Sequence, residues 1–126
     1  MAGIYSKKVL VVEDEPALSD VLIRKLTLSG YDVYHAATGA LGIELAKKNQ
    51  PDLILLDMML GGESGMDVLE AIRRIDTLQQ TKVIIISNSG QPVEIERALE
   101  LGAKDYLIKA QFDPDEVLEK VRMQLH

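Results

Sequence analysis

Three short, wholly apolar runs constrain the fold of this chain more than any other feature. Each consists of four consecutive aliphatic residues, at positions 9–12, 53–56 and 83–86. Such runs are too short for helices and are typical of strands that are buried on both faces. A parallel sheet covered by helices buries both faces, whereas an antiparallel sheet with one wet face alternates apolar and polar residues. The three runs therefore predict the centre of a parallel sheet.

Two weaker segments complete the predicted sheet. Residues 31–36 alternate in side-chain character, as expected of an edge strand, and residues 106–108 form a short strand. Five segments with helical spacing alternate with the strands, without a linker or a repeat. The sequence therefore predicts a single α/β domain over residues 1–126, with its core at about 8–125.

The connections between the strands limit the topology of this domain. Right-handed crossovers leave two common arrangements, a flavodoxin-like doubly wound sheet in the order 2-1-3-4-5 and half of a Rossmann fold. The loop after the first strand is polar and contains no glycine, which disfavours the Rossmann arrangement. We therefore expect the flavodoxin-like five-stranded parallel sheet with five helices.

The helical segments carry recognisable start signals. Candidate capping or first residues occur at Pro16, Thr38, Ser64, Pro92 and Asp113. In the second helix Leu41 belongs to the apolar stripe, while Gly39 and Gly42 predict a weak helix. In the fourth helix, expected over residues 92–101, Leu99 is predicted to face the core.

Charge and composition exclude several classes of function. The chain has 14 basic and 20 acidic residues, a net charge of −6, so direct binding to nucleic acid is not expected. The absence of cysteine rules out disulfides, zinc-thiolate sites and thiol nucleophiles, and it suits a reducing compartment. No apolar run approaches the roughly 18 residues that span a bilayer, and the N-terminus lacks the features of a signal peptide. We expect a cytoplasmic domain without membrane insertion.

Polar side chains follow the ends of four strands in the predicted sheet. Ligands of an open parallel sheet bind beyond the carboxyl ends of its strands, so we expect these side chains to meet in one pocket. The residues, in the order of the strands they follow, are Glu13, Asp14 and Glu15, then Asp57, Ser87 and Lys109. Taken singly, each has an ordinary explanation as a helix-dipole partner, a loop hydroxyl or a solvated lysine. Together they predict a functional site.

The chemistry of this cluster indicates a cation and a phosphoryl group. Carboxylates clustered in a partly buried pocket repel one another, and Mg²⁺, which takes carboxylates, waters and a phosphate oxygen, would suit Glu13, Asp14 and Asp57. The Lys109 ammonium and the Ser87 hydroxyl would stabilise charge on a phosphoryl group. Asp57 ends an apolar run, where an unpaired acid is costly, so it is the best candidate to form an acyl phosphate.

The chain resembles the receiver domain of two-component response regulators, the CheY-like family, over residues 8–125. The resemblance rests on four segments in the family's order and spacing, residues 9–15, 53–57, 83–87 and 102–109. It implies a signalling domain that is not an enzyme, beyond catalysing its own phosphorylation and dephosphorylation. It also implies a sensor histidine kinase or phosphotransfer protein as donor. A downstream protein target would bind the face formed by the fourth helix, fifth strand and fifth helix.

The resemblance also assigns roles to individual residues. Asp57 would be the phosphoacceptor and Lys109 the phosphate-binding lysine. Ser87 would be the switch hydroxyl, and Tyr106 the switch aromatic that moves inward when Ser87 turns towards the phosphate. The ligands of Mg²⁺ would be Glu13, Asp14, Asp57 and the backbone carbonyl of Met59.

Four positions depart from the family pattern. Gly61 stands where proline is usual, Asn88 where alanine is usual, and Glu13 where aspartate is commoner. Ala110 replaces a proline that normally follows the lysine in a cis peptide bond, and a cis bond before another residue costs about 2.5 to 4 kcal/mol. The sequence therefore leaves open whether the bond between Lys109 and Ala110 is cis or trans.

Other function classes share parts of this pattern. A flavodoxin would bind its cofactor phosphate in the first loop, where the acids at 13–15 would repel it. A phosphatase of the haloacid dehalogenase type normally carries a second aspartate two residues after the nucleophile, where this chain has Met59. The main alternative is a receiver-like binding module that does not signal through phosphorylation, which the atypical Asn88 and Ala110 would suit.

Overall fold

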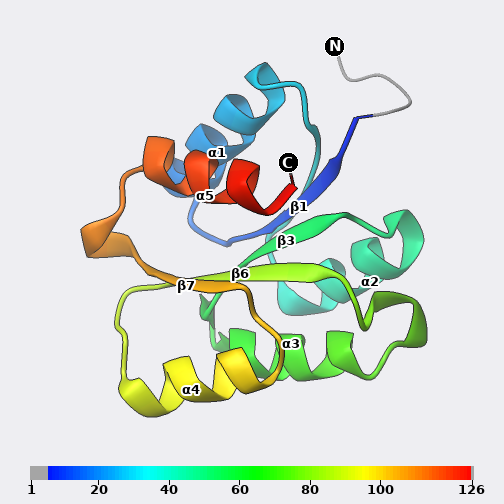
Figure 1. Cartoon of the computed structure of the whole chain (residues 1–126), viewed down its shortest axis with the longest axis vertical. Helices are drawn as coiled ribbons and strands as arrows, with labels where there is room; N and C mark the ends of the chain where they lie inside the picture. Colours follow the sequence, from blue (N-terminus) through cyan, green and yellow to red (C-terminus); the bar gives the residue numbers. More distant parts are fainter. Residues whose placement is uncertain (1–5, 126) are drawn as a thin grey trace.

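Five strands form one parallel sheet, which is seen in the computed structural model of residues 6–125 (Figure 1). The strands are β1 (Lys8–Val12), β2 (Asp32–Ala36), β3 (Leu53–Asp57), β6 (Lys82–Ser87) and β7 (Asp105–Ile108). Their order is β2-β1-β3-β6-β7, and all four pairings are parallel. The predicted 2-1-3-4-5 topology is therefore confirmed, including the edge position of β2. The predicted absence of a signal peptide concerns residues 1–5, which lie outside the described part.

Helices cover both faces of the sheet. On one face α1 (Pro16–Leu28) packs beside α5 (Pro114–Leu125), and the other face carries α2 (Gly39–Asn49), α3 (Gly65–Arg73) and α4 (Pro92–Glu100) (Figure 1). Two short 3-10 helices, η1 (Asp76–Leu78) and η2 (Lys109–Gln111), follow α3 and β7. None of the helices formed by residues 6–125 has the length and apolar character needed to cross a membrane.

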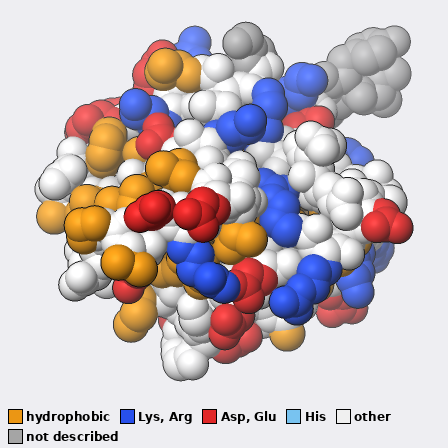
Figure 2. All heavy atoms as spheres, turned by 60° about the horizontal axis from the view of Figure 1, so that its bottom comes forward, with side chains coloured by type: hydrophobic (Ala, Val, Ile, Leu, Met, Phe, Trp, Pro, Cys, Tyr) orange, Lys and Arg blue, Asp and Glu red, His pale blue; other side chains and the backbone are white. Residues whose placement is uncertain are grey.

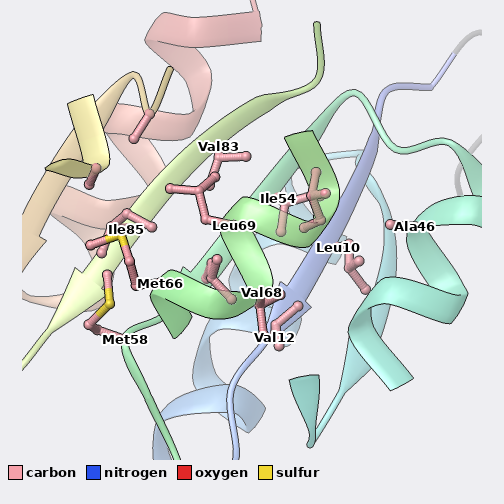
Figure 3. Close-up of a cluster of buried hydrophobic side chains, with 14 of the residues drawn as sticks. Leu10, Val12, Ala46, Ile54, Met58, Met66, Val68, Leu69, Val83 and Ile85 are labelled. Carbon is pink, nitrogen blue, oxygen red and sulfur yellow. The ribbon is translucent and has the colours of Figure 1, made fainter. Parts of the chain in front are cut away.

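The central strands supply side chains to two separate cores. In β1, Val9 and Val11 pack in a cluster with residues of α1 and α5, whereas Leu10 and Val12 pack in a cluster with residues of α2 and α3. Figure 3 shows the second cluster, in which side chains of three strands meet those of α3. These four side chains are all buried. A strand that serves two cores needs apolar residues at consecutive positions, which accounts for the apolar runs.

Side-chain caps start three of the helices as predicted. At α3, Ser64 Oγ accepts a hydrogen bond from the Met66 amide at 3.2 Å. At α2, Thr38 Oγ1 accepts a hydrogen bond from the Leu41 amide at 3.1 Å. At α5, Asp113 Oδ1 accepts from the Glu116 amide at 2.9 Å, and Glu116 Oε1 accepts in return from the Asp113 amide at 3.4 Å. The arrangement at α5 is a capping box, which satisfies two N–H groups at once.

The prediction for α2 is wrong at Leu41. Leu41 is 39% exposed rather than directed into the core. The helix instead packs through its small residues, since Gly39, Gly42 and Ala46 are buried. A Cβ on Gly42 would lie 3.0 Å from Val12 Cγ2, so the glycine allows the helix to approach β1 closely.

The prediction for α4 is wrong at Leu99, which is 49% exposed. The helix ends at Glu100, and its buried residue is Ala98. Because α4 lies next to the edge strand β7, it presents a narrower face to the core than a helix over the sheet centre does.

The structure contains a short hairpin between β3 and α3 that the sequence did not predict. Its antiparallel strands are β4 (Met59–Leu60) and β5 (Glu63–Ser64). The turn consists of Gly61 and Gly62, with φ angles of +53° and +99°. Two consecutive residues with positive φ are typical of tight hairpin turns, and a Gly-Gly pair is a known signal for them. With strands of two residues, no alternation of side chains marks the hairpin in the sequence.

Candidate functional site

The sheet brings the polar residues at its strand ends into one region. Asp57 is the last residue of β3, and Ser87 is the last residue of β6. Glu13 and Asp14 follow β1, and Lys109 follows β7. These four strands are parallel neighbours, so their carboxyl ends lie at the same edge of the sheet. These five of the six predicted residues therefore occupy this edge together.

The Lys109 ammonium joins the buried acids of the pocket. Its Nζ lies 3.0 Å from Asp57 Oδ2 and 3.1 Å from Glu13 Oε1, and Glu15 Oε2 lies 3.7 Å away. Asp57 and Glu13 are both buried, and burial of a charge without compensation is unfavourable. One ammonium cannot neutralise two buried carboxylates, so the pocket carries excess negative charge when both are ionised.

A divalent cation would balance that excess. Glu13, Asp14 and Asp57 each offer one carboxylate oxygen, and the three oxygens lie within 4.8 Å of one another. Two of these side chains are buried and Asp14 is exposed, so an ion held here would keep waters on its open side. Hard oxygen donors with retained waters are the environment that Mg²⁺ prefers. The donor set of this pocket therefore fits magnesium.

The backbone after β3 contacts the carboxylate oxygen of Asp57 that Lys109 does not bind. The Met59 amide donates to Asp57 Oδ1 at 3.0 Å, and the Gly65 amide donates to the Met58 carbonyl at 2.8 Å. A Cβ on Gly65 would lie only 2.3 Å from the Asp57 carbonyl oxygen. A glycine is therefore required for α3 to begin this close to the end of β3.

The β4–β5 hairpin forms another wall of the pocket. A Cβ on Gly61 would lie 3.2 Å from Asp14 Oδ2, so the turn of the hairpin reaches the exposed acid. The φ angle of Gly61 is +53°, which a proline ring cannot adopt. The backbone conformation at this turn is therefore one that the family's usual proline would not allow. Met59, which contributes the predicted carbonyl ligand, is the first residue of β4, and its side chain is 64% exposed.

The pKa values of Glu13 and Lys109 reflect their crowding. Burial, then the hydrogen bond and the charge of Asp57, raise the pKa of Glu13 from 4.5 to about 8, against the opposing effect of its bond from the Glu15 amide. Burial alone would lower the pKa of Lys109, but the hydrogen bonds and charges of Asp57 and Glu13 outweigh it and raise the pKa. Without metal, Glu13 therefore keeps a proton near neutral pH.

This raised pKa predicts how stability depends on pH in the metal-free protein. The unfolded chain releases the Glu13 proton near pH 4.5, whereas the folded protein holds it to about pH 8, so the unfolding free energy falls as pH rises across this range. A Glu13→Gln variant should lose that dependence. At about pH 8 it should be more stable than wild type by about 1–2 kcal/mol, after allowance for the Lys109 ion pair. Urea unfolding with EDTA at both ends of the range measures this, and parallel pH profiles for the two proteins would contradict it.

Ser87 and Tyr106 lie next to the same backbone segment. Ser87 is buried, and its Oγ accepts a hydrogen bond from the Ser89 amide at 3.3 Å. The half-buried Tyr106 donates its hydroxyl proton to the Ser89 carbonyl at 3.1 Å, and Glu94 Oε2 lies 3.4 Å from the same hydroxyl. Burial raises the pKa of Tyr106, so the hydroxyl stays protonated. The two predicted switch residues therefore contact one residue in common.

The loop after Lys109 resolves the question raised by Ala110. No cis peptide bond occurs in the part of the chain that the structure describes, so the bond between Lys109 and Ala110 is trans. Residues Lys109–Gln111 form the short helix η2. The Lys109 side chain nevertheless reaches Asp57 and Glu13, so the alanine does not displace it from the pocket.

Comparison with known proteins agrees with this geometry. Residues 9–122 match the sequence profile of the response regulator receiver domain. The chain is 38% identical over 118 residues to the DNA-binding dual master transcriptional regulator RpaA of Synechocystis. That alignment covers 94% of this chain and 48% of RpaA, so the chain spans about half the length of this relative.

Solved structures show the same likeness. The CheY-like response regulator receiver domain protein from Methanospirillum hungatei superposes with a TM-score of 0.87 at 28% identity, covering 95% of this chain and 94% of that one. The BeF3-activated N-terminal receiver domain of Klebsiella pneumoniae RstA superposes with a TM-score of 0.83 at 28% identity, covering 95% of this chain and 99% of that one. Receiver domains in general are phosphorylated, use Mg²⁺ and signal rather than turn over a substrate. By its sequence and its fold, this chain belongs to the response regulator receiver domain family of two-component signalling.

Proposed function

We propose that this domain is the phosphoacceptor of a two-component phosphorelay, with Asp57 receiving the phosphoryl group from a sensor histidine kinase or a phosphotransfer protein. The observation that carries the proposal is the position of the buried Asp57 carboxylate, whose Oδ2 lies 3.0 Å from Lys109 Nζ and beside the two further acids Glu13 and Asp14. A carboxylate between an ammonium and metal-binding oxygens suits the formation of an acyl phosphate.

The reaction follows from these positions. A carboxylate oxygen of Asp57 attacks the phosphorus, the bond from phosphorus to the donor's histidine nitrogen breaks, and the imidazole leaves. Lys109 pairs with the transferred phosphoryl group. Glu13, Asp14, Asp57 and the Met59 carbonyl would hold Mg²⁺, which would supply positive charge that offsets the charge on the phosphoryl oxygens. The domain catalyses only its own phosphorylation and dephosphorylation.

Phosphorylation is read out through Ser87 and Tyr106. A phosphoryl group on Asp57 offers the Ser87 hydroxyl a new acceptor at the neighbouring strand end. The Ser89 amide, which now bonds to Ser87 Oγ, would lose that partner, while the Ser89 carbonyl is already the acceptor for Tyr106. A change at Ser87 is therefore transmitted to the aromatic residue on β7.

The output surface is the face formed by α4, β7 and α5. On α4 the side chains of Val93 and Leu99 are 75% and 49% exposed. Figure 2, which brings α3 and α4 forward, shows hydrophobic side chains gathered on one side and mixed charges over the rest. Exposed apolar side chains that gather in this way are typical of protein-binding surfaces. A downstream protein target also suits the net charge of −6 better than nucleic acid does.

The proposal extends to the domain and its location. Residues 8–125 would form the core of one receiver domain within residues 1–126, in agreement with the two buried clusters that share its sheet. It would work in the cytoplasm, where histidine kinases draw on ATP. DNA binding is named for RpaA, of which this chain spans about half, and we assign no direct contact with nucleic acid to the chain itself.

Labelling with acetyl phosphate tests the proposed function. The protein is incubated with acetyl phosphate and Mg²⁺, with EDTA replacing Mg²⁺ in a parallel sample, and its intact mass is measured. We expect one added phosphoryl group with Mg²⁺ and none with EDTA. A mass that does not change with Mg²⁺ would contradict the proposal and favour a receiver-like binding module that does not signal through phosphorylation.

A further inference from the structure

Glu63 connects the β4–β5 hairpin to the start of α2. Its Oε1 accepts a hydrogen bond from the amide of Gly39, the first residue of α2, at 3.2 Å. The first N–H groups of a helix have no partner within the helix, and the partial positive charge there favours a carboxylate. Glu63 therefore supplies a capping contact from a segment 24 residues away along the chain.

The close approach at this contact depends on Gly39. A Cβ at this position would lie 2.9 Å from Glu63 Oε2 and 2.6 Å from Val68 Cγ2. Side chains in a packed interior leave no room for such an atom, so any other residue would displace Glu63 or shift α3. Gly39, which by its propensity predicts a weak helix, is therefore the residue that allows the hairpin to reach the start of α2.

Other parts of the hairpin contact the metal-binding pocket. The Met59 amide donates to Asp57 Oδ1 at 3.0 Å, and the turn at Gly61 reaches Asp14. The turn consists of two glycines with positive φ, and a hairpin of two-residue strands has little stability of its own. Its position is therefore set by its contacts with the rest of the domain.

We propose that Glu63 is a positioning residue for the metal site. By holding β5 against α2, it keeps in place both Met59, whose amide bonds to Asp57, and the Gly61 turn, which reaches Asp14. This role rests on the proposed metal-dependent function. Removing groups that orient metal ligands typically weakens metal binding about 10- to 100-fold, and the exposed Glu63 acts through the hairpin, so the lower end of this range applies.

Three variants separate positioning from general stability. Glu63→Ala removes the contact, while Glu63→Gln keeps an oxygen that can accept from the Gly39 amide. Glu100→Ala is the matched control, since it removes an exposed glutamate at the end of α4. The Mg²⁺ dissociation constant is measured by following the backbone amide signals of Asp14 and Asp57 during titration with the metal. Amide proton exchange at Gly39 and urea unfolding are measured in the metal-free protein.

Glu63→Ala should weaken Mg²⁺ binding about tenfold and speed exchange at Gly39. Glu63→Gln and Glu100→Ala should stay close to wild type in both measurements. A merely structural role would instead lower the unfolding free energy and leave the Mg²⁺ affinity unchanged, and that result would overturn the proposal. If wild type itself binds no Mg²⁺, the proposed function fails, and the Gly39 exchange rate alone decides whether Glu63 holds the hairpin.

Discussion

An Asp57→Asn variant is expected to take up no phosphoryl group from acetyl phosphate in the presence of Mg²⁺. A carboxamide is a poor nucleophile and cannot form the acyl phosphate, and its neutral oxygen is a weaker metal ligand than a carboxylate. Because both effects act on the Asp57 side chain, the loss should be complete. Intact mass measures the label, and lability in base identifies it as an acyl phosphate.

Asp20→Asn provides the matched control, because it makes the same change at an exposed position on α1. This variant should be labelled like wild type. Asp57→Asn should also remain folded, since the carboxamide has a similar shape and keeps an oxygen that can accept a hydrogen bond from Lys109. Label that persists on folded Asp57→Asn protein would show that another residue is the acceptor.

Replacing Gly65 by alanine should destabilise the domain strongly. The added Cβ would lie 2.3 Å from the Asp57 carbonyl oxygen and 2.7 Å from Met58 Cα. Both atoms belong to the backbone, so no side-chain rotation relieves the overlap and α3 must move away from the end of β3. We expect the unfolding free energy to fall by about 3 kcal/mol or more, as measured by urea unfolding.

Gly90→Ala is the control for this substitution. A Cβ there would lie 2.4 Å from Ile108 Cδ1, the tip of a side chain that can adopt another rotamer. Its cost should therefore be under about 1 kcal/mol, although the overlap in the structure is nearly as severe. Equal destabilisation by the two variants would show that the backbone contact at Gly65 is not the cause.

The sheet could be predicted because its strands carry a strong local signal. A run such as residues 53–56 has no polar position, and the structure explains this by burial on both faces. The orientation of helix residues depends on contacts that the chain makes elsewhere. Leu99 has helical spacing but lies in a helix beside an edge strand, and Gly42 reduces helix propensity but packs against Val12. Tertiary packing decides whether these two residues are buried, and the local sequence pattern carries no information about that packing.

The site could be predicted largely from one rule, that polar residues at the ends of adjacent parallel strands meet. This rule was sufficient for Asp57 and Lys109, which lie 52 positions apart in the chain and 3.0 Å apart in the structure. It does not reach Glu63, which belongs to the short strand β5 and contacts the start of a helix. No pattern in the neighbouring residues indicates that contact, so only the folded structure reveals it.

The two-sided burial of the central strands also affects how the strands are aligned. When a strand slips by one residue, its apolar side chains normally turn towards water. In β3 the same slip would move side chains from one buried cluster to the other, and both clusters would stay apolar. Hydrophobicity therefore specifies the register of this strand weakly, and its polar ends must define it. At one end the Lys8 amide donates to Asp52 Oδ2 at 2.7 Å, and at the other Lys109 pairs with Asp57. An asparagine at position 57 keeps an oxygen for Lys109 and therefore preserves this alignment. An alanine removes the reactive group and also one of the polar contacts that define the register of β3.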